Sequence, residues 1–144
     1  MTLDEIFEQW EGDAQVDRLQ LGVASLNIPK LHHKYWRILS SERLILKKYE
    51  SDLAALMVDK KSWLSGEMTS DELKERGWNV HLKKMLKTEQ EEFLRADGDV
   101  VQLRLKIALQ SEKVEVLTDI IKSIHNRSFI IGNAIKFAVF QTGG

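Results

Sequence analysis

Apolar residues recur every three or four positions through the first half of the chain. Proline is tolerated in the first turn of a helix, so Pro29 marks a start, and Ser65-Gly66 marks an end. Between them ten positions step by three or four, and eight of these are apolar or aromatic. They are Leu31, Tyr35, Ile38, Glu42, Ile45, Tyr49, Leu53, Leu56, Lys60 and Trp63. The pattern predicts a long helix over residues 29–65 with a coiled-coil-like seam.

A second seam predicts a second long helix over residues 88–125. Thr88 and Glu91 have capping-box spacing at its start, and Asp97-Gly98-Asp99 indicates a kink or break in its first part. Seven of its eight seam positions are apolar: Val100, Leu103, Ile107, Gln110, Val114, Leu117, Ile121 and Ile124. Residues 66–87 connect the two helices, so we expect an antiparallel helical hairpin.

The ends of the chain complete an all-α domain over residues 1–144. Residues 1–28 predict two short N-terminal helices, one begun by a Thr2–Glu5 capping box and ended by Gly12, the other capped by Asp17. In the connector, Thr69 with Glu72 predicts another short helix, which Gly77 ends.

The C-terminal segment, residues 126–144, is different in kind. Nine of the twelve residues from Phe129 to Phe140 are apolar. A helix that is apolar nearly all round must be buried on most sides, and one hairpin of this size cannot supply that cover. The excess predicts that this C-terminal helix drives oligomerisation.

Charge is distributed unevenly, although the net charge is only −1. Residues 1–27 carry six acidic residues and one basic residue, whereas residues 30–61 carry eight basic and four acidic residues. Residues 62–99 are acidic again, with nine against six, and residues 100–144 have six basic against three acidic. Such a chain can bind a polyanion if folding gathers its basic segments on one surface.

Composition argues against an enzyme, a cofactor or a metal site. There is no Cys, which excludes disulfides and thiolate chemistry and fits a reducing cytoplasm. His32 and His33 point to different faces, while His81 and His125 have no ligand partner one helical turn away. We expect the acidic clusters to cap and solvate helices, and they include Glu89, Glu91, Glu92, Asp97 and Asp99. No glycine-rich phosphate loop is present. No apolar run could span a bilayer and the acidic N-terminus lacks a signal-peptide core, so we expect a soluble protein.

The basic segment leaves two interpretations open. Lys30, Lys34, Arg37 and Lys48 fall near one helical face, and Trp36 and Trp63 lie in or next to the same segment. Proteins that bind single strands combine cations with aromatic faces on which bases stack. A structural helical oligomer or scaffold without nucleic-acid binding would show the same pattern, with a solvated charged face and tryptophans in the core.

Three blocks, separated along the chain, form one pattern. The first is Ile28-Pro29-Lys30-Leu31-His32-His33-Lys34-Tyr35 and the second is Trp63-Leu64-Ser65-Gly66. The third comprises Ile124-His125-Asn126-Arg127-Ser128-Phe129, then Asn133-Ala134-Ile135 and Phe137. Together their order, spacing and position resemble the UvsY family of recombination mediators from T4-like phages, and residues 66–100 resemble the family least.

The resemblance implies a ring-like hexamer or heptamer that binds single-stranded DNA. It would promote loading of the phage RecA-like recombinase (UvsX-type) onto DNA covered by the phage single-stranded DNA-binding protein, in the cytoplasm of the infected bacterial host. The residues expected to drive assembly are Phe129, Ile131, Ile135 and Phe137. The family's basic pair falls at Val58 and Lys60, so only Lys60 matches, and Lys61 is the nearest cation to the missing one. The candidate DNA-binding residues are Lys60, Lys61, Lys30, Lys34, Arg37, Lys47 and Lys48.

Overall fold

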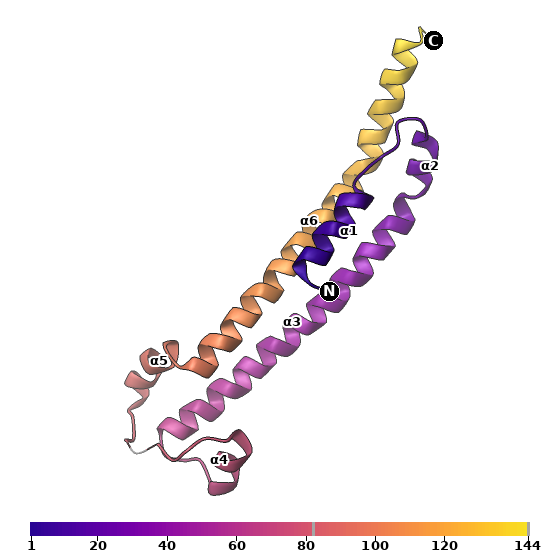
Figure 1. Ribbon diagram of the computed structural model, residues 1–144. Coiled ribbons are helices and arrows are strands. Elements are labelled where there is room, and N and C mark those ends of the chain that lie inside the picture. Colours follow the sequence, from indigo (N-terminus) through magenta and orange to yellow (C-terminus); the bar gives the residue numbers. More distant parts are fainter. Residues whose placement is uncertain (82, 144) are drawn as a thin grey trace. The chain divides into compact units, whose positions relative to one another are not determined.

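Six helices make up the part of the chain that the structure, a computed structural model, describes: residues 1–81 and 83–143 (Figure 1). They are α1 (Leu3–Asp13), α2 (Leu21–Leu26), α3 (Ile28–Leu64), α4 (Ser70–Arg76), α5 (Lys87–Arg95) and α6 (Gly98–Gln141). No strand occurs among these residues. Leu82 of the predicted connector and Gly144 of the predicted terminal segment lie outside the described residues.

Two compact units divide the chain, and both are built on the two long helices. Unit 1 comprises Met1–Leu44 and Gln110–Gly144, and unit 2 comprises Ile45–Leu109. Within each unit a stretch of α3 packs beside a stretch of α6 that runs in the opposite direction (Figure 1). The predicted all-α fold with an antiparallel helical hairpin is therefore confirmed.

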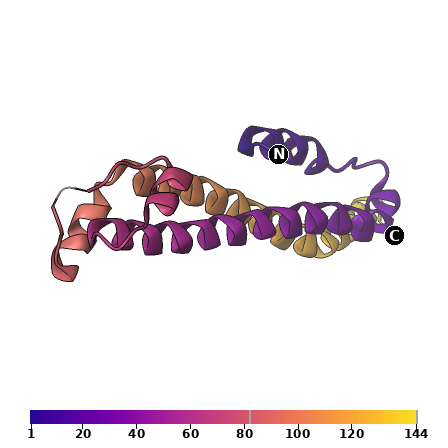
Figure 2. The same ribbon diagram turned by 90° about the horizontal axis from the view of Figure 1, so that it is seen from below.

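The core of unit 1 combines predicted seam positions of both long helices with Leu39 and Ile120, which lie next to the predicted seams. Tyr35 and Leu39 of α3 are buried against Leu117, Ile120 and Ile124 of α6, and Ile6 of α1 joins them. Helix α1 lies along one side of this helix pair, as Figure 2 also shows, with Trp10 edge-on to Tyr35 at 5.5 Å between ring centroids. Burying each large apolar side chain contributes about 1.5–3 kcal/mol, which explains why the seams hold the helices together.

Glu42 and Gln110, the polar residues of the two seams in unit 1, meet in its core. The Gln110 side-chain amide donates to the backbone oxygen of Glu42 at 2.9 Å and also to its carboxylate. Lys113 Nζ lies 3.9 Å from the same carboxylate. Because buried polar groups need partners, this contact satisfies two side chains that would otherwise be costly in a seam.

Unit 2 has its own core, formed by Leu56 and Leu64 of α3, Leu94 of α5 and Val100 of α6. Trp63 and Trp78 pack against this core, with ring centroids 5.7 Å apart. Helix α5 and Trp78, which lies just beyond the end of α4, therefore belong to the packing of unit 2, which the irregular pattern of residues 66–87 did not predict.

Several helix ends follow their sequence signals. The Thr2–Glu5 capping box is formed at the start of α1, and the Thr69 hydroxyl accepts from the Glu72 amide at the start of α4. Gly66 and Gly77 adopt positive φ where α3 and α4 end. Helix α1 runs past Gly12 to Asp13. The prediction that Asp17 caps the next helix was wrong, since its carboxylate accepts from Leu19 N and the cap of α2 is Gln20.

The second long helix, predicted over residues 88–125 with a kink or break at Asp97-Gly98-Asp99, is broken at that place into two helices, and its predicted end at residue 125 was wrong. The chain breaks after α5, and the Asp97 carboxylate accepts from the Val100 amide at 3.2 Å, so Asp97 caps a new helix, α6. The predicted Thr88–Glu91 box gives no cap, because Leu86 occupies the cap position. At the other end α6 continues beyond residue 125 to Gln141, so the apolar C-terminal segment is its last part.

Candidate nucleic-acid interface

Helix α3 carries all seven cations proposed to contact DNA, and six of them are exposed. The exposed set is Lys30, Lys34, Arg37, Lys47, Lys48 and Lys61. Among the described residues only Lys34 of this set forms an ion pair. The other five charges face solvent, where they are available to an anionic partner.

The charge of Lys34 is shared with the protein. Its ammonium lies 2.6 Å from the Asp13 carboxylate, which also accepts from the Tyr35 hydroxyl at 2.8 Å. Burial tends to raise the pKa of Asp13, but the hydrogen bonds from Lys34 and Tyr35 and the charges of Lys34 and Arg127 lower it below its usual value. Burial and the neighbouring Asp13 together raise the pKa of Tyr35 above its usual value. This network joins α1 to α3 within unit 1.

Lys60, the position that the resemblance singled out, is buried. It is only 4% exposed, and its Nζ lies 3.2 Å from Asp97 and 2.9 Å from Asp99. The ammonium also sits over the rings of Trp63 and Trp78, at 4.8 and 4.2 Å from their centroids. A cation that is satisfied by two carboxylates and two aromatic faces is poorly placed to neutralise a phosphate. The arrangement disfavours a direct DNA contact and gives Lys60 a role in the packing of unit 2.

Lys61, the next residue, lines a surface hollow of about 510 Å³ in unit 2. Lys87 lines the same hollow, together with two serines and two carboxylates. The complete lining is Val58, Lys61, Ser62, Ser65, Glu67, Lys87, Gln90 and Glu91. The sequence did not single out Lys87, because nothing in the spacing of the connector shows that it returns to the end of α3.

An exposed aromatic side chain lies on the unit 1 part of α3. Trp36 is 56% exposed, which is unusual for so large a ring, and its centroid is 6.3 Å from that of His32. The His32 ring in turn lies 4.8 Å from that of His125 on α6. The sequence could not bring these two histidines together, since they are far apart along the chain. No cluster of three or more metal-binding side chains occurs in the described parts of the chain.

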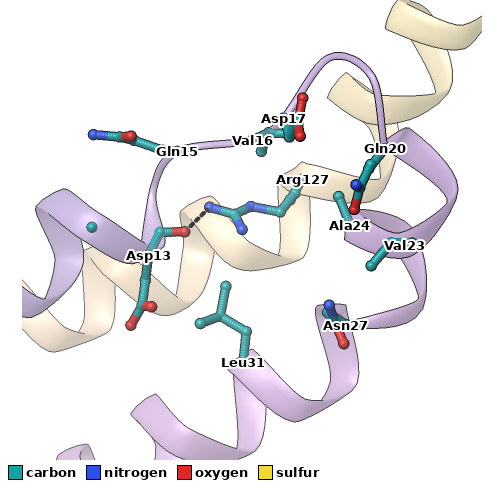
Figure 3. Close-up of a pocket in the computed structure, with 11 residues that line it drawn as sticks. Asp13, Gln15, Val16, Asp17, Gln20, Val23, Ala24, Asn27, Leu31 and Arg127 are labelled. Carbon is teal, nitrogen blue, oxygen red and sulfur yellow. Dashed lines mark hydrogen bonds between the residues drawn. The ribbon is translucent and has the colours of Figure 1, made fainter.

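Arg127, which belongs to the third block of the resemblance, has a structural position. Its guanidinium donates to the backbone oxygen of Asp13 at 2.7 Å (Figure 3). It also lies over the Trp10 ring, at 5.5 Å from the centroid. It borders a hollow of about 290 Å³ beside the link between α1 and α2. Arg127 therefore fastens the end of α1 to α6 within unit 1.

The C-terminal part of α6 presents a row of exposed apolar side chains. Phe129, Ile135 and Phe137 are exposed, as are Ile130, Val139 and Phe140. Ile131, the fourth residue predicted to drive assembly, is 1% exposed and is buried within unit 1. Among the described residues, no helix is long and apolar enough to cross a membrane.

Comparisons with known proteins agree with this fold. The model of one family, described as the recombination, repair and ssDNA binding protein UvsY, matches residues 9–144. Crystal structures of the bacteriophage T4 recombination mediator protein UvsY are similar in fold, for example lattice type II (20% identity, TM-score 0.84, covering 99% of this chain and 98% of that chain). For lattice type IV the identity is 18% and the TM-score 0.85, with 97% and 99% of the two chains covered. Curated protein sequences give no match. Because the family model spans nearly the whole chain, this protein belongs to the UvsY family.

Proposed function

We propose that the protein is a recombination mediator that binds single-stranded DNA as a homo-oligomer. In this role it promotes loading of a phage RecA-like recombinase (UvsX-type) onto DNA covered by the phage single-stranded DNA-binding protein, in the cytoplasm of the infected host. The family description and the name of the T4 relative support the mediator role. The observation that carries DNA binding is the set of exposed cations on α3 that have no carboxylate partner in the described structure.

DNA binding is proposed to use exposed cations of α3 in each of the two units. Lys30 and Arg37 of unit 1 are separated by seven residues, which places them on one face of the helix, and Lys48 belongs to unit 2. Lys47 and Lys61 extend the basic surface, and Lys34 contributes less because Asp13 already neutralises it. The exposed ring of Trp36 is suited to stack with a base, a contact that tolerates any sequence. Lys60 supports this surface by holding unit 2 together.

Assembly is proposed to occur through the end of α6. Phe129, Ile135 and Phe137 are exposed within one short stretch of α6, and exposed apolar side chains that gather in this way mark interaction surfaces. A ring of six or seven copies would bury these side chains against one another. Each copy would then present the same weak DNA site, and the effective concentration of neighbouring sites would multiply the affinity. Wrapping of the strand would displace the competing protein without bond cleavage.

A salt titration of DNA binding tests the proposal. Anisotropy of a labelled single-stranded oligonucleotide should be measured for the intact protein and for Lys30→Ala/Arg37→Ala/Lys48→Ala, with the mass of each checked by light scattering. Three lost phosphate contacts should reduce the log–log salt slope by about 2 per copy engaged, at roughly 0.7 per contact. Lys122→Ala, an exposed lysine on α6, serves as the control for a general charge effect.

The same titration separates the mediator from a purely structural helical oligomer. Internal pairing of Lys34 and Lys60 favours that alternative, because it shows that part of the basic charge serves the fold. An intact oligomer that binds no single-stranded DNA even at low salt would exclude the proposed function and leave the scaffold.

A further inference from the structure

The segment that precedes α5 is fixed against the end of α3. Met85 N donates to the backbone oxygen of Leu64 at 3.0 Å. The buried Gln90 amide donates to Ser65 Oγ at 2.8 Å and to the Met85 oxygen at 3.1 Å. These three hydrogen bonds hold residues 83–87 beside the turn at residues 64–66. All of these residues belong to unit 2.

Gly66 lies at the centre of this contact. Its φ of +73° is a left-handed conformation that side chains rarely adopt. A Cβ atom at this position would come within 3.1 Å of Cε of Lys84. The aliphatic stem of Lys84 therefore lies directly over Gly66, and the lack of a side chain there permits the close approach.

Three lysines consequently gather around the turn. Lys61 and Lys87 line the hollow of about 510 Å³, and Lys84 lies over Gly66 next to the end of α3. All three are exposed, and none forms an ion pair within the described part of the chain. We call Lys61, Lys84 and Lys87 the turn lysines.

The hollow contains groups that favour an anion and groups that oppose one. The hydroxyls of Ser62 and Ser65 line it and are suited to donate to phosphate oxygens. Glu67 and Glu91 line it too, and their charges repel a phosphate. The site should therefore bind a phosphodiester weakly, as expected of one contact among many.

We propose that the turn lysines bind the sugar-phosphate backbone of single-stranded DNA, so that Lys84 and Lys87 extend the DNA-binding surface beyond α3. This inference rests on the proposed function and adds two residues that neither the sequence pattern nor the resemblance indicated. Lysine suits the task because it interacts with phosphate as a point charge and does not depend on base identity. The consequence is a DNA-binding surface in unit 2 formed by two chain segments.

The test removes the charge and keeps the stem. Lys84→Gln/Lys87→Gln should be compared with the intact protein by salt-dependent anisotropy on a single-stranded oligonucleotide. If each lysine neutralises one phosphate, the slope should fall by about 1.4 for each copy engaged, which is about a 25-fold loss of affinity per copy at 0.1 M salt. Lys84→Arg/Lys87→Arg should restore both values. Lys74→Gln on α4, outside the hollow, is the matched control and should change little.

Removing an acidic charge from the hollow gives a second test, with an effect on affinity opposite to that of removing the lysines. Glu91→Gln removes a repulsive charge from the hollow and should tighten binding in the intact protein, but much less in the Lys84→Gln/Lys87→Gln background. Circular dichroism and light scattering verify that fold and mass are unchanged.

The outcomes distinguish this inference from the proposed function. If the intact protein binds single-stranded DNA and the double variant keeps its affinity and slope, the inference is overturned and the proposed function stands. If the intact protein does not bind, both are overturned. Equal losses in the double variant and in Lys74→Gln would indicate a general charge effect and would also overturn the inference.

Discussion

Replacement of Lys60 by Ala should destabilise unit 2 and leave the proposed DNA contacts of α3 intact. The substitution removes the ammonium between Asp97 and Asp99 and takes away its contacts with the Trp63 and Trp78 rings. Breaking a buried ion pair costs about 3–5 kcal/mol, mainly because the remaining charge is left unpaired. Here Asp99 is largely exposed and can be rehydrated, so most of the penalty comes from the unpaired charge of Asp97.

We therefore expect a total loss of about 3 kcal/mol, including about 1 kcal/mol from the two cation–π contacts. A domain is stabilised by only about 0.05–0.15 kcal/mol per residue, so unit 2 should lose a large part of its stability. Native-state hydrogen exchange is the suitable assay, because it reports local opening in oligomers. Amides of unit 2 should exchange roughly 100-fold faster, since 1.4 kcal/mol corresponds to tenfold, while those of unit 1 should change much less.

A second variant tests whether the unpaired charge of Asp97 causes the loss of stability. Lys60→Met keeps the apolar stem against the tryptophans, and adding Asp97→Asn removes the unpaired charge while retaining a capping oxygen for Val100. The double variant should recover much of the lost protection. If Lys60→Ala instead leaves hydrogen exchange unchanged and flattens the salt slope of DNA binding, then Lys60 contacts phosphate directly and the structural interpretation is wrong.

Three further predictions follow from other contacts. Because the pKa of Asp13 is lowered in the folded protein, its network contributes stability above about pH 3.8, and this stability is lost as the pH falls through the pKa of the folded state. The difference in melting temperature between the intact protein and Asp13→Asn should therefore shrink in acid. A difference that does not depend on pH would contradict this. Phe129→Ser/Phe137→Ser should lower the mass in light scattering without loss of helix content, whereas an unchanged mass would place the interface elsewhere. Gly66→Ala should cost about 1–2 kcal/mol for the positive φ, and it should also cost the displacement of Lys84. Gly77 has a similar φ but open space around it, so Gly77→Ala should cost only the φ penalty. Equal losses of stability in thermal melts would show that the Lys84 contact is unimportant.

The helical fold was predictable because it depends on local periodicity. Tyr35, Leu117 and Ile124 lie at the positions that the seams assigned to the core, and all three are buried. The sequence Asp97-Gly98-Asp99 indicated the break before α6. It did not indicate that Asp97 serves both as a helix cap and as the ion-pair partner of Lys60. Helical spacing describes one helix at a time and gives no information on such pairings.

The candidate site was predictable only in part, for the same reason. Exposure of Lys30, Arg37 and Lys48 follows from their place outside the seam of α3. Burial of Lys60 was suggested by its seam position, yet its two carboxylate partners lie on a segment that the sequence could not align with it. Hydrogen bonds from Met85 to Leu64 and from Gln90 to Ser65 bring Lys84 and Lys87 to the end of α3 near Lys61, and these contacts have no sequence signature.

The contact between Glu42 and Gln110 has a consequence for how the chain can change over evolution. A displacement of α3 by one turn relative to α6 would still match apolar rows, but it would strand the Glu42 carboxylate without its amide donor. Misaligned hairpins are thus penalised where purely apolar seams would tolerate them. A deletion within α3 or α6 of unit 1 should therefore require a compensating deletion in the facing helix.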